Sequence, residues 1–219
     1  QSKYDLIVWD WNGTLLNDIE VALDVANGML RRRGLPPMDI PRYRDIFDFP
    51  VETYYRRAGF DFEREPFSAL AREFIEEYDA RISECDLHPG VDETLDRFHR
   101  AGIRQVVLSA SRDVSLRRAV ERYGIARYFD RLYGLQDHFA VSKVELGRTL
   151  IRDFAFPRER VVMVGDTIHD VEVAEQMQIA CVTTEGGHQS RARLEQTGVP
   201  VLRNPAEMCL FVGLDSSVP

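Results

Sequence analysis

The sequence predicts an α/β fold in which a parallel sheet has helices on both faces and a helical segment is inserted after the first strand. Three observations lead to this expectation. Short apolar runs alternate with helical patterns from about residue 89 to about residue 185. A further apolar run, residues 4–10, stands alone near the start of the chain. Between them, residues 38–88 contain helical patterns and no convincing strand.

The elements of the first part follow from local signals. Residues 4–10 read as a buried strand. Asn17 and Asp18 are candidate caps for the next helix, and Glu20 lies three residues after Asn17, as in a capping box. Arginines load the last turn of that helix, and Gly34 and two prolines stop it. Three further helical pieces are expected over 41–47, 50–58 and 66–84.

The second part begins after the pair Pro89-Gly90. Helices are expected near 91–101 and over 112–123, 142–154 and 168–177. Strands are expected over 105–108, weakly near 129–133, and over 161–164 and 180–184. A last strand and helix are weaker. The two junctions of the helical segment, near 16–18 and 86–90, should lie together if that segment sits over the strand ends.

Size and composition restrict the class of protein. With 219 residues the chain can bury a sizeable core, and its 44% apolar content is ordinary for a globular protein. A net charge of −8 argues against nucleic acid or an anionic membrane as a partner, and no apolar run approaches a membrane span. The 3 cysteines are scattered without metal-ligand or disulfide spacing, which favours a reducing cytoplasmic location.

Asp10 is the first candidate functional residue. It ends an apolar strand, where open α/β sheets bind ligands, and the turn at Gly13-Thr14 follows at once. A carboxylate there can act as a nucleophile or a metal ligand, and the backbone N–H groups of the turn can cradle an anion. The simpler interpretation is an aspartate that merely ends a strand.

Ser109 and Lys143 are weaker candidates. Ser109 ends the strand over 105–108, so its hydroxyl and the amide of Ala110 could hold phosphate oxygens, although Ser109 could equally cap the following helix. Lys143 is one of only two lysines, the other being Lys3, among many arginines. It starts a helix, where a cation is unfavourable, so a compact point charge is expected to have a function there.

Asp166 and Asp170 form the most specific motif after the first. They follow the apolar strand over 161–164 and lie four residues apart at the start of a helix. Oxygen ligands of this kind suit Mg²⁺. An acidic helix start is the alternative, and Asp170 fits that alternative in part.

Taken together, these residues resemble the motifs of the haloacid dehalogenase superfamily of hydrolases, most of which are phosphatases. The resemblance covers nearly the whole chain. In that family the first motif reads Asp-x-Asp-Gly-Thr-Leu, and here Asp10 matches the first aspartate while Asn12 replaces the second. The stretch Trp-Asp-Trp-Asn-Gly-Thr-Leu also resembles a phosphoglycolate-phosphatase-like subgroup that carries Asn at that position.

The resemblance implies a Rossmann-like core over 1–16 and 89–219, with a helical cap over 17–88. It implies catalytic roles for Asp10, Asn12 and Lys143, and a small phosphorylated substrate that forms an aspartyl-phosphate on Asp10. The implied substrate-binding residues are Trp11, Ser109, Ala110 and Lys143. The implied Mg²⁺ ligands are Asp10, Asp166, Asp170 and the backbone carbonyl of Asn12. A monomer or a homodimer is expected.

Asn12 leaves several interpretations open, because an amide cannot serve as general acid and base. The substrate could carry a good leaving group, such as an acyl phosphate. Another group, His169 or His188, could replace the missing acid. The protein could instead be a weak or inactive phosphatase that binds a phosphorylated metabolite or a phosphoprotein. Phosphonate hydrolysis through a cap lysine is disfavoured because 17–88 contain no lysine, and the retained Asp166 and Asp170 argue against metal-free dehalogenation.

Residues of the expected cap are ambiguous. Four arginines could meet a second anionic group of the substrate, although solvated helix faces are the simpler interpretation: Arg42, Arg44, Arg56 and Arg57. Tyr54 and Tyr55 are expected to pack against the core rather than on a ligand. His188 lies in a glycine-rich loop that should cover the strand ends, which makes it a weak site candidate.

Overall fold

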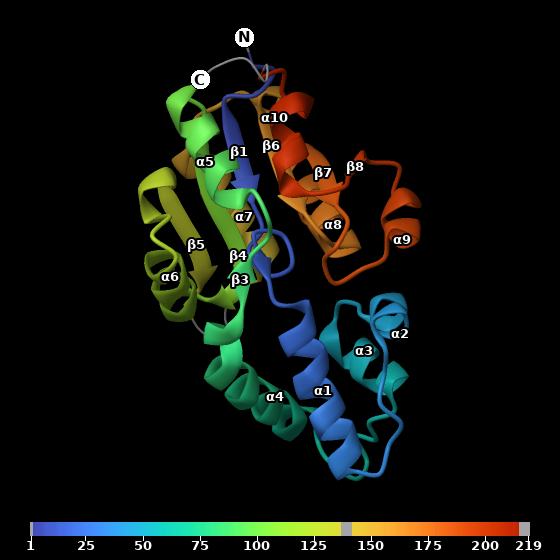
Figure 1. Ribbon diagram of the computed structural model, residues 1–219. Coiled ribbons are helices and arrows are strands. Elements are labelled where there is room, and N and C mark those ends of the chain that lie inside the picture. Colours follow the sequence, from blue (N-terminus) through green and yellow to red (C-terminus); the bar gives the residue numbers. More distant parts are fainter. Residues whose placement is uncertain (1, 137–141, 215–219) are drawn as a thin grey trace.

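A six-stranded parallel sheet forms the centre of the computed structural model, which describes residues 2–136 and 142–214. The strand order is β5-β4-β1-β6-β7-β8, so the first strand in the chain lies in the middle of the sheet (Figure 1). Strand β1 pairs with β4 on one side and with β6 on the other, and all these pairs are parallel. The strands are β1 (Leu6–Trp9), β4 (Arg104–Arg112), β5 (Arg131–Leu135), β6 (Val161–Gly165), β7 (Ala180–Thr184) and β8 (Val201–Leu202).

Helices cover both faces of this sheet, as predicted. Alternate residues of a strand point to opposite faces, so Leu6 and Val8 pack on one side of β1 while Ile7 and Trp9 pack on the other. The first face is covered by α7 (Lys143–Asp153) and α8 (Ile168–Met177). The second is covered by α5 (Val91–Arg100), α6 (Asp113–Arg122) and α10 (Met208–Phe211). Helix α9 (Arg191–Glu195) follows β7, and the 3-10 turns are η1 (Ile82–Glu84), η2 (Ala126–Tyr128), η3 (Arg158–Arg160) and η4 (Pro205–Glu207).

Four helices extend beyond the carboxyl ends of the strands (Figure 1). They are α1 (Ile19–Arg32), α2 (Ile40–Ile46), α3 (Val51–Ala58) and α4 (Phe67–Arg81), and we call them the α1–α4 segment. Arginines at the end of α1 pair with glutamates of α4 and of the loop before it; Arg33, for example, contacts Glu65 and Glu73. These ion pairs hold the two long helices of the segment together at the end far from the sheet.

Both chain crossings into the α1–α4 segment lie side by side. Strand β2 (Leu16–Asn17) pairs antiparallel with β3 (Asp86–Leu87) in a two-stranded ribbon (Figure 1). The junctions therefore meet, as expected. The expectation that residues 38–88 contain no strand is wrong at Asp86–Leu87, where two residues are too few to show a sequence pattern.

Two other local expectations are corrected. No capping box forms at Asn17, because Asn17 belongs to β2 and the helix cap is Asp18, whose side chain makes no cap hydrogen bond. Ser109 does not end its strand, since β4 continues to Arg112 through an irregularity after Leu108. None of the described helices is long and apolar enough to cross a membrane.

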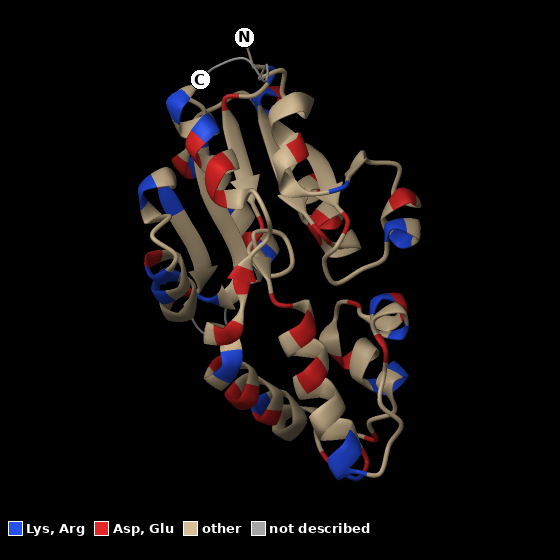
Figure 2. Cartoon of the chain, in the orientation of Figure 1, with Lys and Arg blue, Asp and Glu red and all other residues tan. Residues whose placement is uncertain are grey.

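Acidic and basic side chains are mixed over the outer helices. Figure 2 shows Lys and Arg interspersed with Asp and Glu along them. Most of the described arginines lie in ion pairs such as Arg104–Asp130 and Arg160–Asp5.

Candidate active site

Three buried carboxylates meet at the carboxyl ends of β1 and β6. Each of Asp10, Asp166 and Asp170 offers an oxygen that lies within 4.8 Å of the others. Asp10 is 6% exposed and follows β1 directly, with its amide donating to the Val164 carbonyl at 2.9 Å. Sheet pairing thus continues up to the carboxylate, which fixes its position. The structure therefore brings together the three acidic residues that the sequence singled out.

Glycines and a threonine allow this close approach. Thr14 Oγ1 donates to Asp166 Oδ1 at 3.1 Å and lies 3.3 Å from Asp10 Oδ2. Gly13 has a φ of +78°, and a Cβ on it would lie 2.2 Å from Asp166 Oδ2. A Cβ on Gly187 would meet the same oxygen at 2.2 Å. Larger residues at either position would displace the Asp166 carboxylate.

Asp170 belongs both to the start of a helix and to the carboxylate cluster, the two interpretations made from the sequence. It is the third residue of α8, and Thr167 and Asp170 form a capping box at the helix start. Its Oδ2 accepts from the Thr167 amide, the Thr167 hydroxyl and the Asp166 amide at 2.9–3.1 Å. Its Oδ1 faces Lys143 instead. One oxygen is thus used by the helix cap, and the other points into the cluster.

Lys143 connects the cluster. It is the first residue of α7, which Ser142 and Glu145 cap, and it is 6% exposed. Its Nζ donates to Asp10 Oδ1 at 2.6 Å and to Asp170 Oδ1 at 2.7 Å. The lysine that the sequence singled out at a helix start is thus a buried cation between two carboxylates.

Removal of this cation gives a testable result. We expect Lys143→Met to lower the free energy of unfolding by about 3–5 kcal/mol without divalent cations, because two buried carboxylates lose their counter-ion. Urea unfolding at neutral pH measures the change. Lys3→Met, at the only other lysine of the chain, is the matched control and should leave stability unchanged. Equal stability of both variants would contradict the assigned ion pair.

The charges in this cluster do not balance. One ammonium group faces three carboxylates, so negative charge is left over. Burial and the neighbouring Asp170 raise the pKa of Asp10, although Lys143 opposes them. Burial also raises the pKa of Asp166 well above its usual range. Burial acts likewise on Asp170, but Lys143 and Thr167 outweigh it and lower its pKa.

These three residues fit a divalent cation. Their oxygens converge, they are buried, and their excess charge would be neutralised by such an ion. Binding would favour the ionised forms of Asp10 and Asp166. Magnesium in particular is considered with the proposed function.

The amide of Asn12 is held on all sides. Its Nδ2 donates to Asp18 Oδ2 at 3.2 Å and to the Tyr78 hydroxyl at 2.9 Å. Its Oδ1 accepts from the Ser111 hydroxyl at 2.6 Å. Tyr78 in turn donates to Asp18 Oδ2 at 2.6 Å. An amide suits these partners, since a carboxylate at position 12 would face that of Asp18.

Asp18 also pairs with His188. His188 Nε2 lies 3.0 Å from Asp18 Oδ1, and its Nδ1 lies 2.6 Å from the Tyr43 hydroxyl. Burial disfavours the charged imidazole, yet Asp18, Asp166 and Asp10 outweigh burial and raise the pKa of His188 to about 9. The His188 amide also donates to Asp166 Oδ2 at 2.7 Å, which joins this pair to the carboxylate cluster.

The Asp18–His188 pair makes the free energy of unfolding depend on pH. Folding raises the pKa of His188 from 6.5 to about 9, so the protonated imidazole stabilises the folded state. The stabilisation is complete below pH 6.5 and is lost as the pH rises through 9. We expect the free energy of unfolding to fall by about 3 kcal/mol over that range, at about 1.4 kcal/mol per pKa unit. Urea unfolding at both ends of the range measures it. His188→Gln should remove the fall, whereas His99→Gln, on the exposed side of α5, should keep it.

A cavity of about 590 Å³ adjoins the carboxylate cluster. Asp10, Asp166 and Lys143 line one end of it. Arg112, the last residue of β4, and Ser115, Arg118 and Arg122 of α6 also line the cavity. The α1–α4 segment contributes a largely apolar wall that includes Phe47, Phe49, Tyr54, Phe67, Phe74 and Ile75. This volume is in the range of small-molecule sites.

Comparison with known proteins identifies the family. A family profile described as haloacid dehalogenase-like hydrolase matches residues 7–184. The chain belongs to the haloacid dehalogenase-like hydrolase family. The match includes Asp10, Lys143, Asp166 and Asp170, so the buried cluster lies within the shared part. The chain is accordingly a hydrolase.

Sequence relatives cover most of the chain. A phosphoglycolate phosphatase from Mesorhizobium japonicum is 27% identical over 194 residues, which are 85% of this chain and 85% of the relative. A 5'-nucleotidase from Pseudomonas aeruginosa is 26% identical over 199 residues, covering 88% of this chain and 87% of the relative. Among solved structures, a haloacid dehalogenase-like family hydrolase from Streptococcus pneumoniae has a TM-score of 0.81 at 18% identity and covers 95% of this chain and 98% of its own. This last likeness concerns the fold.

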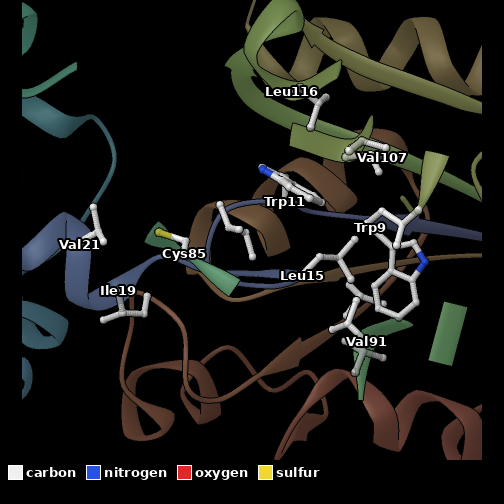
Figure 3. Close-up of a cluster of buried hydrophobic side chains, with 14 of the residues drawn as sticks. Trp9, Trp11, Leu15, Ile19, Val21, Cys85, Val91, Val107 and Leu116 are labelled. Carbon is white, nitrogen blue, oxygen red and sulfur yellow. The ribbon is translucent and has the colours of Figure 1, made fainter. Parts of the chain in front are cut away.

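Of the residues expected to bind substrate in this haloacid dehalogenase-like hydrolase, some line the cavity and one is buried away from it. Ala110 lines the cavity, whereas Ser109 is fully buried and its hydroxyl accepts from the Ser111 amide at 3.0 Å. Trp11 reaches the cavity but is 2% exposed. Figure 3 shows Trp11 in a cluster of buried apolar side chains with Leu116. Its ring also packs on Tyr123, with centroids 6.1 Å apart.

The four arginines of the expected cap have other partners. Arg44 donates to the Gly187 carbonyl, Arg42 to the Arg57 carbonyl, and Arg57 pairs with Asp48. Arg56 lies over the Phe62 ring. None of the four is among the described residues that line the cavity. The structure therefore gives no support to these arginines as anion contacts.

Three further residues of the site were not singled out as such. The sequence indicated a helix cap at Asp18 and gave no role to Tyr43 or Tyr78. All three line the cavity. His169, one of the two histidine candidates, lines the cavity and stacks on Phe49. Only the buried state of Asp18, invisible in the sequence, separates it from an ordinary cap.

Proposed function

We propose that this hydrolase is a Mg²⁺-dependent phosphatase that acts on a small phosphorylated metabolite through an aspartyl-phosphate on Asp10. One observation carries the proposal: Asp10 is buried at a strand end, held by Lys143, and lines a cavity large enough for a metabolite. The printed activities of two relatives, phosphoglycolate phosphatase and 5'-nucleotidase, agree with a phosphate ester as substrate.

Each residue of the site has a separate role in the proposed reaction. Asp10 attacks phosphorus, an O–P bond forms, and the ester oxygen leaves with its electron pair. Lys143 opposes the rise in the pKa of Asp10 and offsets negative charge beside it. The amides of Gly13, Thr14 and Leu15 donate to backbone carbonyls within the turn, so the amide of Ala110, which lines the cavity, would hold a phosphoryl oxygen. Water then cleaves the aspartyl-phosphate and regenerates the carboxylate.

Magnesium would be held by Asp10, Asp166, the Asn12 carbonyl and Asp170. When bound, it would neutralise phosphoryl oxygens and the excess carboxylate charge. The raised pKa values of Asp10 and Asp166 support a cation there, because burial disfavours both carboxylates and Lys143 contacts only Asp10 of the two. Asp170 contributes chiefly through Lys143, since one of its oxygens already accepts three hydrogen bonds.

Asn12 restricts the reaction. It has no proton to give to a departing oxygen, and general acid catalysis is typically worth about 10²–10⁴-fold. Esters with poor leaving groups should therefore react slowly. His188 lines the cavity, but both of its ring nitrogens are already hydrogen-bonded within the protein.

We also propose that residues 17–88 form a cap over a core made of 1–16 and 89–219, although residues 1, 137–141 and 215–219 lie outside the described part. The β2–β3 ribbon supports this division, because it joins both crossings at one place. The cap would set the substrate, since it supplies most of the apolar cavity wall. A cytoplasmic location and a monomeric or homodimeric state remain predictions.

Phosphate release tests the function. The whole chain is incubated with a panel of phosphorylated metabolites and acyl phosphates, with Mg²⁺ and then with excess chelator. We expect release that stops with chelator and returns with Mg²⁺. Release that is indifferent to the chelator would contradict metal dependence.

One alternative has an observation in its favour. Because Asn12 replaces an acid, the scaffold could bind a phosphorylated metabolite or phosphoprotein with little or no turnover. The intact Asp10, Lys143, Asp166 and Asp170 argue against it, since loss of catalysis removes the need for them. A tight ligand that binds without Mg²⁺ and is never hydrolysed would establish this alternative.

A further inference from the structure

The wall of the cavity opposite the carboxylates is apolar. On α4 five lining residues recur at helical spacing and are partly buried: Phe67, Ala71, Phe74, Ile75 and Tyr78. The only charged lining residue of α4 among the described residues is the exposed Asp79, and the lining arginines, Arg112, Arg118 and Arg122, belong to β4 and α6. The α4 wall itself therefore offers no cation to the acidic group of phosphoglycolate. It suits an organic group that gains free energy by leaving water.

Part of this wall lies outside the hydrophobic clusters that the described residues form. Ile75 and Phe49 line the cavity, yet neither belongs to the two hydrophobic clusters formed by the described residues. Phe49 presents its ring to His169 and to Phe47, both of which also line the cavity. Large apolar side chains with surface open to a cavity are what a ligand with an apolar body would cover.

Tyr54 contributes its ring to the same cavity. Its side chain lines the cavity and is 3% exposed, and its hydroxyl has no hydrogen-bond partner among the described residues. The ring is fixed by Tyr43, at 5.7 Å between centroids, and by Phe47, at 5.2 Å. The hydroxyl is enclosed by protein atoms, so the ring of Tyr54 is the part that a ligand in the cavity would contact, and the hydroxyl could pair with a ligand only if its neighbours moved.

Asn12 restricts the leaving group of the same substrate. With no acid at this position, the departing oxygen must accept the electron pair without a proton. A phenol ionises near pH 10, as tyrosine does at about 10. An aliphatic alcohol is a far weaker acid, so its ester depends much more on general acid catalysis. An aromatic alcohol thus has both properties: its ring can pack on the apolar wall, and its oxygen can leave without a proton.

We propose that the site takes phosphate monoesters of aromatic alcohols, with the ring against the α4 wall. This rests on the proposed phosphatase function. Asp10 forms the O–P bond, the P–O bond to the ring breaks, and the phenolate leaves with the electron pair. Water then releases phosphate from Asp10, and the phenolate takes a proton from solvent.

A substrate series tests both parts of the proposal. We expect kcat/KM with Mg²⁺ to fall from 1-naphthyl phosphate to phenyl phosphate, and at least about tenfold further to benzyl phosphate, whose ring is kept but whose leaving group is poor. Phosphoglycolate should lie at least about tenfold below phenyl phosphate, since it lacks the apolar contact as well. Phosphoglycolate equal to or better than phenyl phosphate would overturn the proposal.

A matched pair of variants tests the wall. Ala71 lines the cavity and Ala69 is exposed on another side of α4. Ala71→Phe fills the space for the ring and should lower kcat/KM for 1-naphthyl phosphate at least about tenfold. The same change at Ala69 should have no effect on kcat/KM for 1-naphthyl phosphate. Equal effects of the two variants on 1-naphthyl phosphate would contradict the assigned wall.

Failure here is separable from failure of the proposed function. Mg²⁺-dependent hydrolysis of acetyl phosphate without preference for aryl esters would refute the aryl assignment and leave the phosphatase. If no ester is hydrolysed, calorimetry with the Asp10→Asn protein decides. Tighter binding of 1-naphthyl phosphate than of phosphoglycolate supports the aryl site in a non-hydrolysing protein, and equal or weaker binding refutes it.

Discussion

Asp10→Asn should abolish Mg²⁺-dependent phosphate release. The amide keeps the shape of the side chain but is not a nucleophile, so no aspartyl-phosphate can form. Loss of a residue that forms the covalent intermediate lowers kcat by at least about 10³-fold in comparable enzymes. Release of phosphate from acetyl phosphate or phenyl phosphate measures the effect.

Asp5→Asn is the matched control for this variant. Asp5 precedes the same strand and pairs with Arg160 at the amino ends of β1 and β6, whereas the cluster lies at their carboxyl ends. It should keep full turnover. Substantial turnover by Asp10→Asn would show that Asp10 is not the nucleophile. Mass spectrometry of the acid-quenched wild type should find phosphate on Asp10 and none in the variant.

Asn12→Asp should restore general acid catalysis. The new carboxylate would lie beside that of Asp18, which Asn12 contacts at 3.2 Å, and two like charges so close share a proton. A carboxyl group that stays protonated near neutral pH can donate to a leaving group. We expect turnover of alkyl phosphates such as benzyl phosphate to rise by about 10²-fold or more.

Phenyl phosphate and a distant variant are the controls for Asn12→Asp. The leaving group of phenyl phosphate needs little protonation, so its gain in rate should be much smaller than that of benzyl phosphate. Asn204→Asp makes the same change at an exposed helix cap and should change neither rate. An equal gain for both esters, or no gain at all, would show that another group already provides the proton.

Much of the fold could be predicted because its signals are local. Strand β1 is an apolar run, and α7 and α8 begin at capping residues that the sequence displays. The β2–β3 ribbon was not predicted, because two-residue strands carry no periodicity and depend on a partner far along the chain. Ser109 was misplaced because the irregularity in β4 arises from pairing with β5.

The site was predictable only in part. Asp10, Lys143, Asp166 and Asp170 stand out because charged residues follow apolar strands or occupy an unfavourable helix start. Asp18 does not stand out, since an acid before a helix is normally a cap. Its role comes from His188, 170 residues further along, and no local pattern reports such a contact.

The position of Asn12 has a mechanical consequence. One of its hydrogen bonds reaches Tyr78 on α4, whereas its other partners, Ser111 and Asp18, belong to β4 and to the residue just after β2. The α1–α4 helices are attached to the sheet through a single ribbon, so they have one pivot about which to swing. Other hydrogen bonds, such as those from Arg44 to the Gly187 carbonyl and between Tyr43 and His188, join these helices to the loop after β7. The bond from Asn12 to Tyr78 differs from them in its place, because it ties α4 to the turn two residues after Asp10. A change at position 12 therefore acts both on the chemistry beside Asp10 and on the attachment of α4.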